Sequence, residues 1–234
     1  MSSLDPSFFD RILHSRSSCR AYLDREIERE TLQGILSVAS RAPSGSNIQP
    51  WRVYVLQGQS LKDLSQKVIQ SHDALARDPS LSTNFPKPYE YYPTQWKSPY
   101  IERRRENGWG LYKLLGIERD QKDKMHLQHQ KNFAFFGAPV GLIFTIDKTL
   151  EKGSWIDYGM FLQNIMLAAH ARGLATCPQA AWVNFSTLVM PHIGASGDES
   201  LVCGMSLGWP NEQELVNTFK TPRVAVDEFT TWLS

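Results

Sequence analysis

The first clear repeat of hydrophobic positions lies between residues 29 and 42. The segment reads "RETLQGILSVASRA", and its apolar residues recur three and four positions apart behind an acidic opening. This spacing predicts an amphipathic helix that ends before Pro43. Its buried face is expected to hold Leu32, Ile35, Leu36 and Ala39.

Runs of β-branched and aromatic residues predict the strands. The run "WRVYVLQG" predicts a strand that Gly58 ends. The run "APVGLIFTID", residues 138–147, is apolar without alternation, which is typical of a central strand covered on both faces. Two shorter strands are expected at "LATC", residues 174–177, and at "SLVCGMSLGW", residues 200–209.

A helix is predicted over 155–173, where apolar residues nearly encircle the axis. Such a helix must be buried, and a subunit interface is one place for it. Gly173 is placed to close its C-terminus. Beyond residue 214, Pro222 and the alternating Val224 and Val226 predict an extended arm.

Together these elements predict an α+β fold, with helices on a sheet that lacks regular βαβ alternation. The 234 residues suit one domain, 1–234. A segment at about 78–125 differs in texture, being rich in proline, tyrosine, tryptophan and arginine. We expect it to be an irregular insertion that covers the active site, because it is too aromatic for a disordered linker.

Composition excludes several classes of protein. A net charge of +1 lacks the basic excess of a nucleic-acid-binding protein. No segment has the apolar length of a membrane span or the pattern of a signal peptide. The three cysteines form no C-x-x-C pair, which favours a reducing compartment. The expectation is a cytoplasmic protein with neither a nucleic-acid nor a membrane partner.

Several catalytic motifs do not occur in the sequence. It contains no G-x-G-x-x-G after a strand, no Walker sequence and no G-x-S-x-G. His126 and His129 are three residues apart without a further ligand in view, so a solvated helix surface is expected and no metal site. Cys177 has no recognisable activating base, and a small buried thiol is the better interpretation.

Two polar segments are more informative. "RSSCR", residues 16–20, places two arginines and two hydroxyls together, as a solvated turn or as a phosphate site. "APSGSNIQPW", residues 42–51, carries hydrogen-bonding side chains between a helix and a strand. Arg223 in "KTPR" would, taken alone, be a surface residue.

In order and spacing, these segments together with "GLATCPQAAW" and "SLGWP" resemble the FMN-dependent nitroreductase family. The resemblance covers most of the chain outside the insertion. It implies a nitroreductase-like fold: a central, mainly antiparallel sheet flanked by helices, in an intertwined homodimer with FMN at the subunit interface.

The resemblance also implies which residues bind the cofactor. Arg16, Ser18 and Arg223 would hold the phosphate, and Arg20 would lie near N1 and O2 of the flavin. The loop at 43–47 would come from the other subunit, and the turn at 177–179 would pass beside the ring through its backbone. The cofactor-binding residues are therefore Arg16, Ser17, Ser18, Arg20, Pro43, Ser44, Gly45, Asn47, Cys177, Pro178, Gln179 and Arg223.

The implied activity is ping-pong, two-electron reduction of nitroaromatic compounds, with NADPH or NADH as donor and no catalytic side chain. Nitrobenzoates, nitrophenols and quinones are candidate acceptors. The alternatives are a quinone or enone reductase, a reductive dehalogenase, or a slow flavin-binding redox sensor. Tyr92, Trp96 and Tyr100 of the insertion are the candidates for contact with substrate; the alternative, given equal weight, is that the aromatic rings pack the insertion onto the core. Residues 103–105, all arginine, either attract an anionic acceptor or, as favoured here, face water.

Overall fold

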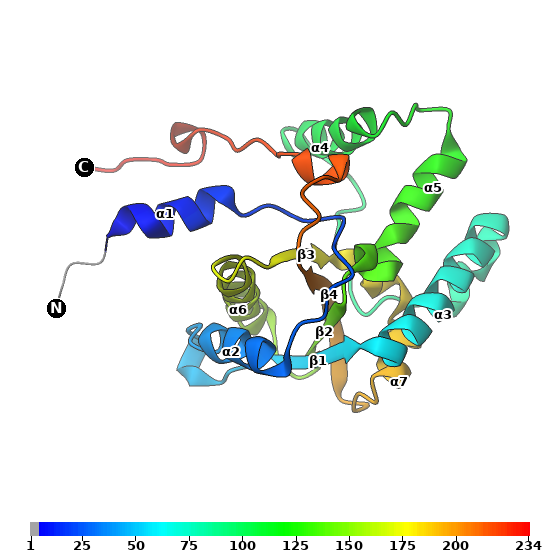
Figure 1. The fold of residues 1–234 in the computed structure, drawn as a ribbon, viewed down its shortest axis with the longest axis horizontal. Helices are drawn as coiled ribbons and strands as arrows, with labels where there is room; N and C mark the ends of the chain where they lie inside the picture. Colours follow the sequence, from blue (N-terminus) through cyan, green and yellow to red (C-terminus); the bar gives the residue numbers. More distant parts are fainter. Residues whose placement is uncertain (1–4) are drawn as a thin grey trace.

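Four strands form one antiparallel sheet in the computed structural model, which describes residues 5–234 (Figure 1). The strands lie in the order β1-β2-β4-β3. Their bounds are β1 Arg52–Gln57, β2 Val140–Asp147, β3 Ala175–Gln179 and β4 Glu199–Gly208. The predicted α+β fold with a central antiparallel sheet is confirmed.

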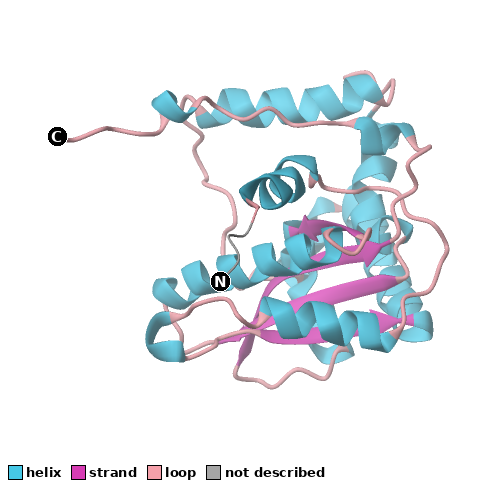
Figure 2. Cartoon of the chain, turned by 60° about the vertical axis from the view of Figure 1, so that its left-hand side comes forward, coloured by secondary structure: helices cyan, strands magenta, loops and turns pink. Residues whose placement is uncertain are grey.

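Helices cover both faces of this sheet (Figures 1 and 2). On one face α2, Arg29–Ala39, packs with α6, Lys152–His170. On the other face lie α3, Gly58–Arg77, and α7, Ser186–His192, with the 3-10 turns at Lys131–Gly137 and Ala180–Phe185. The predicted amphipathic face of α2 is buried at Leu32, Ile35 and Ala39.

The position of β2 inside the sheet, with a core on each face, explains why its sequence is apolar without alternation. Leu142, Phe144 and Ile146 enter the core beneath α2 and α6, whereas Ile143 enters the core on the opposite face. Successive side chains of a strand point to opposite faces, so a strand covered on both sides must be apolar at every position.

A β-bulge at Val202 of β4 changes which face the strand presents. Phe144 pairs with Cys203 and Thr145 pairs with Leu201, so Val202 is the extra residue. Tyr89 of the insertion donates its hydroxyl hydrogen to the carbonyl oxygen of Val202. The insertion is thereby hydrogen-bonded to the central sheet.

Helix α6 is apolar nearly all round, as predicted, yet the single chain does not cover all of it. Tyr158, Phe161 and Ile165 are buried, while Ile156 is 70% exposed. Its C-terminus has the Schellman pattern: Gly173 has φ +73°, and the Leu174 N–H donates to the Ala169 carbonyl.

The insertion is irregular at residues 85–99, as expected, but the expectation is wrong for its later part. That part contains α4, Tyr100–Leu114, and the start of α5, Lys122–Gln130. Neither helix has a clear apolar stripe, and α4 buries none of its residues, so periodicity gave no helical signal. Helix α4 is instead held from outside, where Phe219 of the C-terminal segment lies against Gly110.

Both ends of the chain carry exposed apolar side chains. Helix α1, Pro6–Ser15, exposes Phe8 and Phe9. The C-terminal segment leaves the body of the domain (Figure 2) and exposes Phe229 and Trp232. Its extended course agrees with the predicted arm, apart from a short 3-10 turn at Val226–Glu228. Within residues 5–234, no helix combines the length and the apolar character needed to span a membrane.

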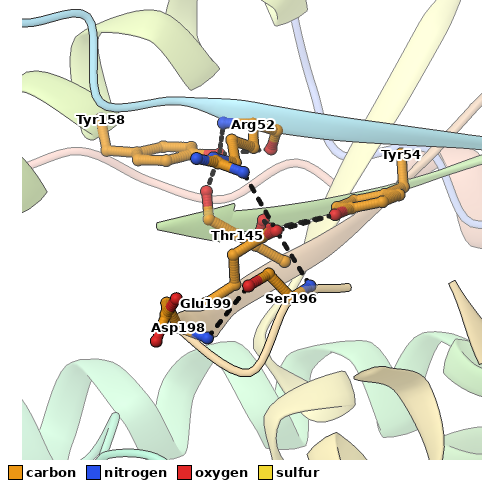
Figure 3. Close-up of polar contacts among 7 residues, drawn as sticks. All are labelled: Arg52, Tyr54, Thr145, Tyr158, Ser196, Asp198 and Glu199. Carbon is orange, nitrogen blue, oxygen red and sulfur yellow. Dashed lines mark hydrogen bonds and ion pairs between the residues drawn. The ribbon is translucent and has the colours of Figure 1, made fainter. Parts of the chain in front are cut away.

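A buried carboxylate ties together the ends of three strands (Figure 3). Glu199 of β4 is 4% exposed. It accepts one hydrogen bond from the Thr145 hydroxyl of β2 and another from the Tyr54 hydroxyl of β1, the latter at 3.0 Å. The Ser196 N–H and the Arg52 guanidinium, each at 3.2 Å, complete its donors. A buried charge is tolerated because its oxygens are so fully hydrogen-bonded.

Candidate active site

The segment Arg16–Arg20 lies along the free edge of β3. Ser18 forms a parallel bridge with Thr176, and the Cys19 N–H donates to the Thr176 carbonyl at 3.0 Å. Asn217 holds the segment from the other side, because its Oδ1 accepts from the Arg20 N–H at 2.7 Å. Three regions far apart in the sequence thus meet at one edge of the sheet.

A basic cavity of about 430 Å³ opens beside this segment. Residues of "RSSCR" near the N-terminus and of "KTPR" near the C-terminus line this cavity together, as expected from the sequence. Its polar lining comprises His14, Arg16, Ser17, Ser18, Arg20, Lys220, Thr221 and Arg223. Lys220 was not singled out from the sequence; its Nζ donates to Ser17 Oγ at 3.2 Å.

The charge of this basic cavity is not balanced by the protein. Among the described residues, none of Arg16, Arg20, Lys220 and Arg223 forms an ion pair with a carboxylate. Burial, and then the neighbouring charge of Arg223, lower the pKa of Arg16. Unpaired guanidinium and ammonium groups around a concave site suit a phosphate, which accepts several charge-assisted hydrogen bonds.

A second, aromatic cavity of about 440 Å³ adjoins the first. It is lined by Cys177, Pro178 and Gln179, and by Tyr89, Tyr91 and Tyr92 of the insertion. The turn expected at 177–179 is wrong, because these three residues are the end of β3 and pair with β4. Arg20 lines both cavities. The two cavities therefore suit one elongated ligand, with a phosphate at the basic end and a planar ring at the aromatic end.

The end of β3 carries no reactive side chain into the aromatic cavity. Burial raises the pKa of Cys177 to about 11, so the thiol stays protonated at neutral pH. Gln179 is buried, and its Nε2 donates to the Asn132 carbonyl at 2.6 Å. The protonated thiol argues against Cys177 as a nucleophile, and a backbone contact of Cys177 with a flavin stays a prediction.

The loop 42–51 lies apart from both cavities of this chain. Pro43, Ser44, Gly45 and Asn47 are not in the lining of either one. The loop is nevertheless rigidly built: Ser44 Oγ accepts from the Gln49 N–H at 3.0 Å, and Ser46, Asn47 and Gln49 all have positive φ. Such backbone strain in non-glycine residues is often found at ligand sites.

The aromatic residues of the insertion divide into two groups. Tyr92 lines the aromatic cavity, whereas Trp96 and Tyr100 are outside its lining. The Trp96 ring centroid lies 5.5 Å from that of Tyr92, and Tyr100 is 61% exposed. The arginines 103–105 are exposed on α4, outside the lining. Sequence reasoning missed Gln128 and His129 of α5 and Phe136, which do line the cavity.

Comparison with known proteins identifies the family and the relatives to which the chain is similar. The model of the Nitroreductase family matches residues 13–209. The chain is 40% identical over 222 residues to a 4-nitrobenzoate reductase of Pseudomonas putida, covering 95% of this chain and 94% of that protein. It is 38% identical over 226 residues to a 4-nitrobenzoate reductase of Nocardioides sp., covering 96% and 90%.

A solved structure is similar along almost the whole chain. It is the FMN and NADPH-dependent nitroreductase NfnB from sphigopyxis sp. strain HMH, with a TM-score of 0.90 and 35% identity. The similarity covers 99% of this chain and 100% of that chain.

Proposed function

The chain belongs to the Nitroreductase family, and from this premise we propose that it is an FMN-dependent oxidoreductase that reduces nitroaromatic compounds with NADPH or NADH. One observation carries the proposal: Arg20 lines both the basic and the aromatic cavity. A phosphate joined to a flat ring by a flexible chain fits that arrangement, and FMN has this form.

The residues of the basic cavity would hold the FMN phosphate. Arg16 and Arg223 provide guanidinium donors, and Ser18 and Lys220 complete the surround. Arg20 lies at the aromatic end of the site, and its positive charge would stabilise the electron-rich, reduced form of the flavin ring. The Asn217 side chain keeps Arg20 in place by accepting a hydrogen bond from the Arg20 backbone N–H.

The chemistry of bound FMN is two-electron transfer at the ring, so the chain needs to bind, orient and exclude water. We assign no side chain a catalytic role, because the buried Cys177 thiol is protonated and unsuited to nucleophilic attack. Phe136 and Tyr92 would shield the ring end and stack against a planar acceptor. The insertion would cover this end of the site and influence which acceptors enter.

The acceptor is expected to be a nitrobenzoate or a similar nitroaromatic compound. Both relatives described above are 4-nitrobenzoate reductases. Asn107 in the cavity lining would donate from its side-chain amide to a carboxylate, whereas Lys87 is already paired with Glu90 at 3.2 Å.

A homodimer would complete the site. Support comes from the exposed loop 43–47, the uncovered Ile156 of α6 and the apolar C-terminal segment. In this arrangement Ser44 and Asn47 reach the flavin bound by the partner. Light scattering should give twice the chain mass, and a monomeric variant should lose FMN. An FMN-loaded monomer would contradict the arrangement.

We also infer a cytoplasmic location. Its support is that all three cysteines are free and buried, as suits a reducing compartment.

Anaerobic stopped-flow spectroscopy tests the function. NADPH or NADH should bleach the flavin rapidly, and 4-nitrobenzoate should restore its absorbance. Absence of bleaching would overturn the proposal and favour a slow redox sensor. A steady-state comparison of 4-nitrobenzoate with nitrobenzene, quinones, enones and halophenols then separates nitroreduction from the alternative activities.

A further inference from the structure

Three histidines and an aspartate meet between α3 and α5, beside the aromatic cavity. His72 and Asp73 are neighbours on α3, and His126 and His129 lie one turn apart on α5. We call these four residues the histidine cluster. His129 is exposed, as expected for a solvated helix surface, and His126 is partly exposed. The expectation that the two lack a further potential ligand is wrong, because His72 stacks on both rings at 4.3 and 5.2 Å between centroids.

The donor atoms of the histidine cluster lie close to one another. His126 Nε2 lies 2.7 Å from Asp73 Oδ1, and His129 Nδ1 lies 3.2 Å from His72 Nε2. His72, Asp73 and His126 offer donor atoms that all lie within 4.8 Å of one another. In a tetrahedral zinc site, bonds of about 2.0–2.1 Å place the ligand atoms about 3.4 Å apart. Small side-chain movements would therefore bring these atoms to coordination distance.

The chemistry of the donors fits a borderline metal ion. Neutral imidazoles with one carboxylate are common ligands of Zn²⁺. The Nδ1 atom of His72 is buried and has no hydrogen-bond partner within the described part of the chain.

We propose that the histidine cluster binds a divalent transition-metal ion of the Zn²⁺ type, linking α5, which follows the insertion, to α3 of the domain core. The rings of His72 and His126 are within 12° of parallel, so their lone pairs do not converge. One ring must rotate on binding, and the His126 side chain is 25% exposed. Since α5 also presents Gln128 and His129 to the aromatic cavity, the ion would fix one wall of the site.

Calorimetric titration with Zn²⁺ tests the site directly, using the full-length, FMN-loaded protein without a polyhistidine tag and after treatment with a chelator. Saturation at one ion per chain is expected. His126→Ala and Asp73→Asn should each weaken binding at least about tenfold, as loss of a ligand or of its charge does. Because heat of binding is measured, the result is independent of nitroreductase activity.

The matched control is His192→Ala, which removes a histidine whose Nε2 lies 2.9 Å from the Ser60 carbonyl, also on α3. It should leave Zn²⁺ affinity unchanged. FMN content and circular dichroism show whether each variant is folded; should one variant fail, the other still decides. No saturable binding by the unaltered protein, or undiminished binding by both cluster variants, would overturn the proposal.

Discussion

The indole of Trp182 lies directly against the backbone of Gly204 in β4. A β-carbon added at Gly204 would lie 2.3 Å from Cδ1 of Trp182, closer than real side chains approach. Trp182 is fully buried and stacks on Phe135 at 4.5 Å, so it has no room to withdraw. The close approach of the 3-10 turn after β3 to the sheet depends on this glycine.

Gly204→Ala should therefore destabilise the protein by about 1–3 kcal/mol, the usual effect of overpacking a core. Urea unfolding measures the change. Gly108→Ala is the matched control, because Gly108 is inside α4 and nothing lies within 4 Å of an added β-carbon. It should be neutral or stabilising by up to about 1 kcal/mol. Equal effects of the two substitutions would contradict the packing argument.

Glu199 should make stability depend on pH. Burial raises its pKa, but the hydrogen bonds from Thr145, Ser196 and Tyr54 and the charge of Arg52 outweigh burial, so the pKa lies below its ordinary value. A group with a lowered folded-state pKa stabilises the protein above its unfolded-state pKa, and this contribution is lost as the pH falls through the folded-state pKa.

Glu199→Gln should lower the free energy of unfolding by about 1–3 kcal/mol at pH 7. The difference from the unaltered protein should shrink as the pH falls below about 4. Arg52→Gln should have a smaller effect, under about 1 kcal/mol, because the Arg52 side chain is 55% exposed. Urea unfolding across this pH range is the measurement, and a constant difference would argue against the assignment.

Arg16→Gln and Arg223→Gln should each weaken FMN binding tenfold or more. Loss of a charge-assisted hydrogen bond to phosphate corresponds to about 1.5–3 kcal/mol. Fluorescence titration of the cofactor-free protein measures the dissociation constant. Arg103→Gln provides the control, since residue 103 is exposed on α4 outside both cavities. Unchanged affinity in both test variants would show that the FMN phosphate does not bind in the basic cavity.

Cys177→Ala should retain nitroreductase activity within about threefold, because its thiol is buried and its pKa is about 11. Thiol-alkylating reagents should likewise leave the native enzyme active. Rates and FMN content are compared with those of the unaltered protein. A loss of activity of a hundredfold or more, with FMN still bound, would show that the thiol takes part in the chemistry.

Local patterns in the sequence determined the sheet and its main helices. The apolar run of β2 and the helical spacing in α2 reflect burial, and burial depends on residues close together in the chain. The resemblance to the nitroreductase family also indicated Arg16, Ser18 and Arg223 as one group. The sequence alone did not reveal α4, because that helix buries no residue of its own and depends on contacts such as that of Phe219 with Gly110.

Only the tertiary structure decided which distant residues meet. Lys220 and Asn217 join the site because the C-terminal segment folds back beside β3. The histidine cluster has the same origin: His126 and His129 lacked a partner in their own segment, and helix packing brings His72 and Asp73 to them. Periodicity reports whether a position is buried, but it carries no information about which element covers it; long-range packing alone supplies that.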